Sequence, residues 1–454
     1  MTKDLTEGSP ARLILFFTLP LIGGNIFQQL YNFIDTLLVG RFLGVEALAA
    51  VGCTGCLMFL LVGFTIGLSA GLSIYTGQRF GAKDYEGVHK SAAACLVLAL
   101  IVGAVLALCG VLSARSVLIM MDTPPDILDG AVSFISIIFA GIPITVVFML
   151  EANLIRALGD SRRPTYILAA ALCTNIIIEP IFLLVFKWGI PGAAYGVLVS
   201  QFLGAVIVIT YIWKKVPLLT IRRQDWDLDW KFLKSHLAIA LPMAFQTSII
   251  ALGTVVLQMA LNKLGPVSVA AFAAAQKVET IALMPMMSFG IAMAAYTAQN
   301  YGARKLARIK KGVNQCILMS GAFSIAVGVF NIVFGPELME LFVGSSEPEV
   351  VHLGQVYLVT TSVCYLVLAL LFIYRNTLQG LGQSFVPSLA GVMELVMRAM
   401  VALCFVDSLG FWGASIASPA AWFGSCIPLA LAYYYTLHKM KTNIRAIKKV
   451  QVGK

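Results

Sequence analysis

Charged residues are scarce in this sequence: they make up 12% of its 454 residues, whereas hydrophobic residues make up 59%. An ordinary soluble domain contains about 25% charged residues, so half of the usual solvated surface is missing. That shortage excludes a soluble enzyme and an extracellular disulfide-bonded module. Because a helix needs roughly 20 apolar residues to cross a bilayer, the sequence predicts an all-α integral membrane protein with twelve transmembrane helices. The predicted spans are 13–36, 46–77, 90–112, 128–152, 165–186, 191–213, 236–262, 268–299, 312–335, 349–378, 385–407 and 412–437.

Motifs for nucleotide binding and for catalysis are also missing. The sequence has no GxxxxGKS or GxxxxGKT loop, no HExxH pair and no GxSxG elbow with a plausible base. Its nine cysteines are scattered through predicted spans and its four histidines lie near span ends, a distribution that does not build a zinc site. We therefore expect no enzyme, no catalytic residue and no cofactor, with an ion gradient as the energy source.

The basic residues are distributed unevenly about the predicted spans. Of the 32 Lys and Arg residues, 26 lie at one set of ends and loops, Arg375 among them, and four lie on the opposite side. The other two, Lys277 and Arg398, lie within spans. Since cytoplasmic loops carry an excess of Lys and Arg, both termini are expected in the cytoplasm. The net charge of +10 thus indicates topology, and no nucleic-acid partner is expected.

The chain repeats itself. Residues 19–83 match residues 241–304, and within them the segment QRFGAK (78–83) corresponds to QNYGAR (299–304). Each half contains six predicted spans, so both halves enter the membrane from the same side and are related by an axis along the membrane normal. We predict four regions with a substrate path between the lobes: an N-lobe (1–213), a cytoplasmic linker (214–235), a C-lobe (236–438) and a basic cytoplasmic tail (439–454).

Ionisable residues inside a bilayer are costly and usually functional. In the first predicted span, Asn25, Gln29, Asn32 and Asp35 follow helical spacing, with Gln28 and Tyr31 beside them. This polar stripe is expected to face the bundle interior. Asn175 and Glu179 are four residues apart and therefore also share a helix face. Hydrogen bonding between helices is one interpretation of such residues. For the two carboxylates we favour ion coupling, because burial and mutual repulsion favour protonation, while clustered oxygens also suit sodium.

The second half has lost these acids, because Val256–Leu257 and Ala402 occupy the matching positions. It has charges of its own, and Glu394 and Arg398 are four residues apart, a spacing that lets them bridge each other. Lys277 and Glu279 are two apart and face different ways. Structural and substrate-contact roles are both open for these residues. The substrate-cavity candidates are Gln28, Tyr31, Asn32, Lys277, Glu279, Glu394 and Arg398. The charges within the spans are predicted to share one water-filled cavity that reaches the outer face: Asp35, Glu179, Lys277, Glu279, Glu394 and Arg398.

The segment LPLIGGNIFQQLYNFIDTLLVGRFLGVEALAAVG (19–52), followed by GQRFGAKD (77–84) and its echo AQNYGARK (298–305), resembles the multidrug and toxic compound extrusion (MATE) family. The likeness covers essentially the whole chain. It implies a twelve-helix, two-lobe antiporter that expels organic cations and drugs in exchange for H+ or Na+.

The chain is similar to the bacterial branch of that family, in which the coupling site lies in the N-lobe. The resemblance implies that Asp35, Asn175 and Glu179 form this site, with Na+ as a possible ligand and no other metal. Glu179 stands where the family has Asp, Val197 replaces a frequent Thr, and Ile250 replaces an acid of another branch. We expect a monomer in the plasma (inner) membrane of a prokaryote, in contact with lipid. The alternative function is a lipid-linked oligosaccharide flippase of the same superfamily.

Overall fold

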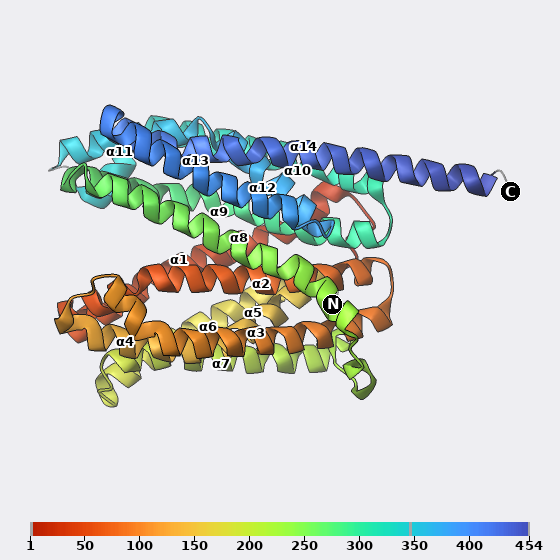
Figure 1. Ribbon diagram of the computed structural model, residues 1–454, viewed down its shortest axis with the longest axis horizontal. Coiled ribbons are helices and arrows are strands. Elements are labelled where there is room, and N and C mark those ends of the chain that lie inside the picture. The colour runs from red at the N-terminus through yellow and green to blue at the C-terminus, as the bar shows by residue number, and fades with distance from the viewer. Residues whose placement is uncertain (1–2, 345–346, 453–454) are drawn as a thin grey trace. The chain divides into compact units, whose positions relative to one another are not determined.

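The structure is a computed structural model that describes residues 3–344 and 347–452, and all regular structure in these ranges is helical (Figure 1). Within them, ten helices are long and apolar enough to span a membrane, and two bent pairs raise the number to as many as twelve. This confirms the all-α membrane fold. The helices are α1 (Pro10–Cys53), α2 (Gly55–Gly81), α3 (Tyr85–Met120), α4 (Pro125–Ala140), α5 (Ile142–Ala157), α6 (Arg162–Pro180), α7 (Ile190–Lys215), α8 (Trp230–Asn262), α9 (Pro266–Gly302), α10 (Leu306–Val343), α11 (Pro348–Ser362), α12 (Tyr365–Gly380), α13 (Phe385–Leu409) and α14 (Phe411–Val452), with short helices η1 (Ile181–Val185), η2 (Pro217–Leu219) and η3 (Arg223–Trp226).

Two of the predicted spans are broken rather than straight. The fourth consists of α4 and α5, which meet at Gly141 with a bend of 47°, and the tenth consists of α11 and α12, with a bend of 50°. Proline lies in the first turn of α5, where its missing N–H costs no intrahelical hydrogen bond. The predicted loop between the first two spans is instead a kink within α1, at Gly44, whose φ of 83° suits glycine.

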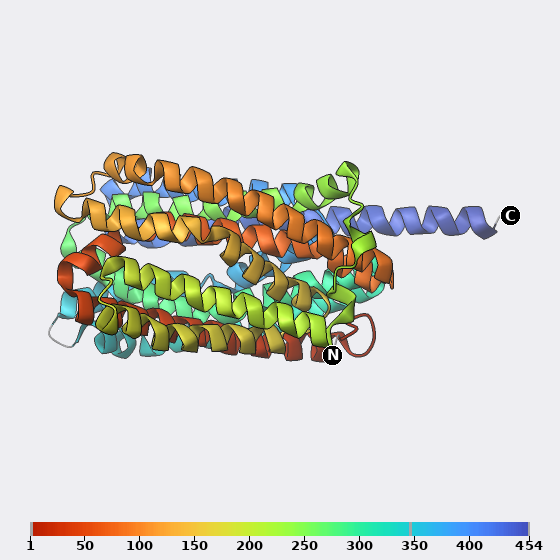
Figure 2. The same cartoon turned by 90° about the horizontal axis from the view of Figure 1, so that it is seen from below.

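The chain forms two compact units. The first, called the N-unit here, contains residues 1–4 and 19–244, and the second, the C-unit, contains residues 5–18 and 245–454. Helices α1 and α8 each contribute residues to both units. The two units are defined by which residues pack together. The two lobes predicted above are defined instead by the sequence match between the halves of the chain. In Figures 1 and 2 the end of α14 extends beyond the other helices of the C-unit.

Close backbone contact joins α2 to the first part of α8 within the N-unit. A Cβ atom added to Gly67 would lie 2.4 Å from the carbonyl oxygen of Met243, and one added to Gly71 would lie 2.5 Å from the Cα atom of Ala240. No larger residue fits at either position without a shift of backbone. Glycines spaced by four along α2 therefore set this contact, as small residues do in membrane helix pairs.

A chain of buried hydrogen bonds fixes the same end of α8. The oxygen atoms of Thr76 and Ser91 lie 2.7 Å apart, and the Ser91 oxygen lies 2.8 Å from Nε2 of His236. The other ring nitrogen, Nδ1, lies 2.9 Å from the carbonyl oxygen of Phe232. Because a carbonyl oxygen only accepts, Nδ1 carries a proton. The imidazole thus connects α2, α3 and α8.

Asp84 caps the N-terminus of α3. Its side chain accepts a hydrogen bond from the Gly87 N–H at 3.0 Å and from Arg79 Nη1 at 2.6 Å. Partial burial alone would raise the pKa of Asp84, but the hydrogen bonds from Gly87 and Arg79 outweigh it and hold that pKa below its usual value. The QRFGAKD motif thus includes a capped helix start.

The echo of this motif in the C-unit holds the segment before α1. Gln299 Oε1 accepts from the Leu5 N–H at 2.8 Å, and Asn300 Nδ2 donates to the Leu5 carbonyl oxygen at 3.1 Å. Lys305 Nζ donates to the Thr6 carbonyl oxygen at 3.0 Å, and Arg308 Nη1 donates to that of Gly8 at 2.9 Å. These four contacts all involve main-chain atoms of residues 5–8. The polar residues of the second motif and of the turn after it are therefore a clamp for this segment.

Candidate functional site

The predicted coupling residues come together in the N-unit, where α1 meets α6. Tyr31 and Asp35 lie one helical turn apart on α1, and Asn175 and Glu179 lie one turn apart on α6. The Tyr31 hydroxyl donates to Asp35 Oδ1 at 3.3 Å, and Asn175 Nδ2 donates to the Tyr31 oxygen. Tyr31 therefore connects the two helices by accepting from one and donating to the other.

The two carboxyl groups are neighbours. Those of Asp35 and Glu179 are close enough to repel each other when both are ionised. In a buried site such repulsion favours protonation of one carboxyl group or a compensating cation.

The cluster has more acceptors than donors. Asn175 and Glu179 are 1% and 0% exposed. The Asn175 Oδ1 atom and both Glu179 carboxyl oxygens are buried and accept no hydrogen bond from the described part of the chain. Buried polar atoms normally have partners, so these three oxygens are candidate acceptors for a proton or a hard monovalent cation. We call Tyr31, Asp35, Asn175 and Glu179 the carboxyl cluster.

Glycine on α7 allows this cluster to be packed tightly. A Cβ atom added to Gly196 would lie 3.1 Å from Asn175 Oδ1 and 3.2 Å from the Glu179 Cα atom. Any side chain at this position would be in tight contact with Asn175 and Glu179. Sequence reasoning did not identify Gly196, although its place among the small residues of the GAAYG segment (192–196) was a usable signal.

The other polar residues of the α1 stripe lie outside the cluster. Gln28 Nε2 donates to Asn32 Oδ1 at 3.1 Å, and this pair has no hydrogen bond to the cluster among the described residues. Asn32 and Gln29 are exposed, whereas Asn25 and Gln28 are half-buried. Their predicted role in a substrate cavity stays a prediction.

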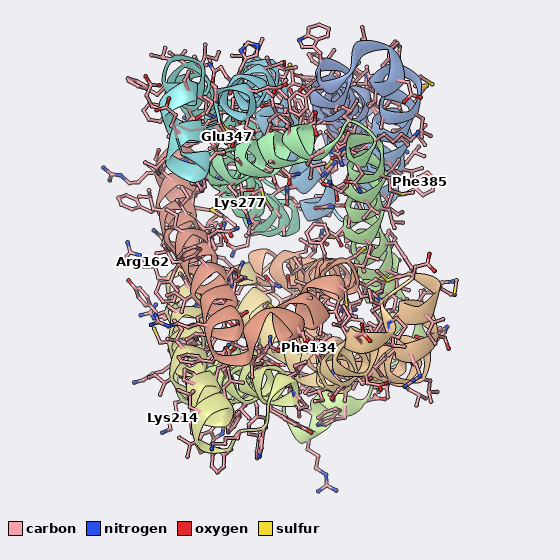
Figure 3. The ribbon with its side chains drawn as sticks, turned by 90° about the vertical axis from the view of Figure 1, so that its left-hand side faces the viewer. Phe134, Arg162, Lys214, Lys277, Glu347 and Phe385 are labelled. Atoms are coloured by element: carbon pink, nitrogen blue, oxygen red, sulfur yellow. The ribbon has the colours of Figure 1, made fainter. Side chains whose placement is uncertain are left out.

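The charges predicted in the second half lie in the C-unit. Glu394 Oε1 lies 3.5 Å from Arg398 Nη2, so the expected pair on α13 is present. Glu279 is buried and its Oε2 atom accepts from the Tyr357 hydroxyl at 2.6 Å. Lys277, labelled on α9 in Figure 3, is exposed. The different exposure of Lys277 and Glu279 agrees with their predicted opposite directions, and the common cavity stays a prediction.

Arg375 is one of the basic residues assigned above to the cytoplasmic span ends and loops, and this assignment stays a prediction. It lies within α12, is 7% exposed, and donates from Nη2 to Glu394 Oε2 at 2.7 Å. Glu394 therefore bridges two buried arginines rather than one. A lone Arg in an apolar stretch at 365–375 was the available signal, which counting basic residues by loop did not use.

Sequence comparison identifies relatives along the whole chain. A family profile described as MatE matches residues 20–181 and again 242–404. A probable multidrug resistance protein of Bacillus subtilis, YoeA, is 28% identical over 463 residues, covering 99% of this chain and 98% of the relative. A FAD transporter of Shewanella oneidensis is 25% identical, covering 96% of both chains.

Solved structures share the fold. A crystal structure of a MATE protein in complex with MaL6 has a TM-score of 0.89 at 23% identity, covering 97% of this chain and 100% of that one. An outward-facing multidrug resistance transporter has a TM-score of 0.88 at 24% identity, covering 96% of this chain and 98% of the other.

Proposed function

The chain belongs to the MATE family of multidrug efflux transporters, and from this premise we propose that it is a secondary antiporter. It exports drugs and organic cations in exchange for H+ or Na+, by alternating access. We place it in the prokaryotic plasma membrane as a monomer with both termini in the cytoplasm. Relatives named as multidrug resistance proteins support a small-molecule substrate, as does the relative named as a FAD transporter.

The observation that carries this proposal is the excess of buried acceptors in the carboxyl cluster. Asn175 Oδ1 and both oxygens of Glu179 lack donors in the described residues, and the neighbouring carboxyl of Asp35 cannot supply one unless it is protonated. Loading the cluster with a proton or Na+ removes the repulsion, whereas unloading restores it. Occupancy therefore changes the free energy of the state that holds the ion.

Such a change is what antiport requires. A ligand shifts a conformational equilibrium only by its differential affinity for the two states. If the state that takes up the ion is not the state that takes up the drug, each cycle exchanges one for the other. Tyr31 is positioned to transmit occupancy from α6 to α1, since it hydrogen-bonds to Asn175 and Asp35.

The proposal is tested by drug efflux from proteoliposomes under separately imposed gradients. With the purified protein, a pH gradient at constant Na+ and a Na+ gradient at constant pH are compared. We expect one of them to drive dye accumulation against its gradient, and that gradient identifies the ion. Accumulation under neither gradient, in vesicles that retain bound dye and intact gradients, would contradict coupled transport.

A lipid-linked oligosaccharide flippase is the second candidate. The buried arginines Arg375 and Arg398 favour it, because such a substrate carries phosphate groups. Translocation of a radiolabelled lipid-linked precursor across the same vesicles, with no drug efflux, would support this alternative.

A further inference from the structure

A cluster of buried polar side chains lies between α8, α12 and α13 of the C-unit. Glu394 receives hydrogen bonds or ion pairs from two arginines, at 2.7 Å from Arg375 and 3.5 Å from Arg398. Nearby, Gln379 Nε2 donates to Gln246 Oε1 at 2.9 Å. We call these five residues the arginine cluster. One carboxylate thus serves two guanidinium groups, which together present ten N–H bonds.

The arginine cluster has donors without acceptors. Arg398 Nε and Nη1, Arg375 Nε and Gln246 Nε2 are all buried and have no hydrogen-bond partner in the described ranges. Arg398 is 4% exposed and Gln246 is 2% exposed. A buried guanidinium N–H without an acceptor is unfavourable, so these donors are candidates to bind an acceptor group.

Glycine on α8 allows Arg398 to approach that helix closely. A Cβ atom added to Gly253 would lie 3.1 Å from Arg398 Nη1. Gly253 follows Gln246 by seven residues on α8, so both lie on one face of that helix. The same face contacts α13, because a Cβ atom on Gly391 would lie 2.8 Å from Gln246 Cγ. The free donors of Arg398 and Gln246 therefore lie where α8 packs against α13.

Glu279 does not supply the missing acceptor. It interacts electrostatically with Arg398, but no ion pair joins the two among the described residues, and its Oε2 atom is engaged by Tyr357. Its Oε1 atom is also without a partner. The donors of Arg398 and this oxygen are thus left unmatched in the same unit.

We propose that the arginine cluster binds an oxyanion, a carboxylate or phosphate group carried by the transported molecule, with Arg398 as the principal contact. The free Nε and Nη1 groups of Arg398 and the free Nε of Arg375 can donate charge-assisted hydrogen bonds to the oxygens of such a group. This assignment rests on the proposed function and deepens it, because it adds an anionic group to the substrate class. It also gives the units opposite polarity: the free buried atoms are acceptors in the carboxyl cluster and mainly donors in the arginine cluster.

Two dyes with the same ring system test the proposal. Fluorescein is an anion with a carboxylate and rhodamine 6G is a cation without one, and binding of each to the purified full-length protein is measured by fluorescence polarisation. We expect Arg398→Gln to weaken fluorescein binding at least about tenfold and to leave rhodamine 6G binding within about twofold. Arg398→Lys keeps the charge but has no planar set of N–H donors, so its affinity for fluorescein should be intermediate. Arg115→Gln, at an arginine whose side chain is 61% exposed, is the matched control.

Gly253→Ala keeps the proposal testable if Arg398→Gln does not fold. Its methyl group would lie 3.1 Å from Arg398 Nη1 and displace the guanidinium without removing the charge, so it should weaken fluorescein binding alone. The assignment would be overturned if the variants lost affinity equally for both dyes, or if neither variant changed the affinity for either dye. Failure of the unaltered protein to bind fluorescein would also overturn it.

The source of the oxyanion is distinguished by competition. Displacement of fluorescein by inorganic phosphate supports a free or solute-borne group, whereas displacement in phosphatidylglycerol nanodiscs but not in phosphatidylcholine nanodiscs supports a lipid headgroup. These measurements use no ion gradient, so a failure of coupling at the carboxyl cluster would leave them unchanged. Conversely, gradient-driven efflux of rhodamine 6G would persist if only the oxyanion assignment were wrong.

Discussion

Replacing Asp35 with asparagine should abolish coupling while the fold is retained. The introduced amide is nearly the same size as the carboxyl group, and its oxygen can still accept from the Tyr31 hydroxyl, now at 3.3 Å from Asp35 Oδ1. Its N–H group can donate to Glu179, whose oxygens otherwise lack a donor from the described chain. We therefore expect the free energy of unfolding to change by less than about 1 kcal/mol.

The effect on transport follows from the same geometry. A hydrogen bond from the introduced amide stabilises the Glu179 anion. Because Glu179 is then the single carboxylate of the cluster, no neighbouring charge changes its affinity for the ion during the cycle. In a pH gradient of about two units, one proton per cycle supplies about 2.7 kcal/mol, enough for roughly a hundredfold accumulation of substrate. In Asp35→Asn the accumulation ratio should fall to about 1, while dye affinity stays within about twofold.

The assay is dye accumulation in proteoliposomes with an imposed gradient, together with dye binding and thermal unfolding of the same preparation. Asp129→Asn is the matched control, because that carboxylate, 82% exposed, lies in a surface ion pair with Arg115. Glu179→Gln should weaken coupling less, since Asp35 keeps its charge and its hydrogen bond from Tyr31, which connects it to Asn175 on α6. If Asp35→Asn inserts normally and pumps at the normal rate with normal ion dependence, the carboxyl cluster is not the coupling site.

Three further predictions concern topology and stability. Cysteines introduced at 214–235 should react with an impermeant reagent only from the cytoplasm, and labelling in intact cells would refute the proposed orientation. Gly67→Ala should lower stability by about 1–3 kcal/mol through overpacking, measured by thermal unfolding, because its Cβ atom would lie 2.4 Å from Met243; Gly23→Ala, with nothing within 4 Å, should not. Asp84→Ala should cost about 1 kcal/mol through the lost cap. Because the folded pKa of Asp84 is lowered, its stabilisation should be complete above the unfolded pKa of about 3.9 and be lost as the pH falls through the lowered value.

Hydropathy and spacing by themselves determined the fold class and most residues of the carboxyl cluster. A span facing lipid or a packed bundle must be apolar along its length, so twelve spans could be predicted from the apolar runs. Spacing by four placed Asn175 and Glu179 on one helix face, whereas Tyr31 was placed only beside the stripe that contains Asp35. The matched motifs in the two halves also revealed the repeat, because similar local sequences form similar local structure.

Contacts between helices were decided only by the tertiary structure. A hydropathy profile reports apolar residues but not the direction of a helix axis. The bends of 47° and 50° in two spans were therefore not predicted. The pairing of Arg375 on α12 with Glu394 on α13, at 2.7 Å, depends on the packing of these two helices. Likewise, the meeting of Asp35 with Glu179, the clamp on residues 5–8 and the free donors of Arg398 all depend on side chains from separate helices. Sequence periodicity determines the helix face on which a residue lies, whereas the packing of helices determines which residues contact that face. Whether a buried donor or acceptor has a partner therefore depends on helix packing.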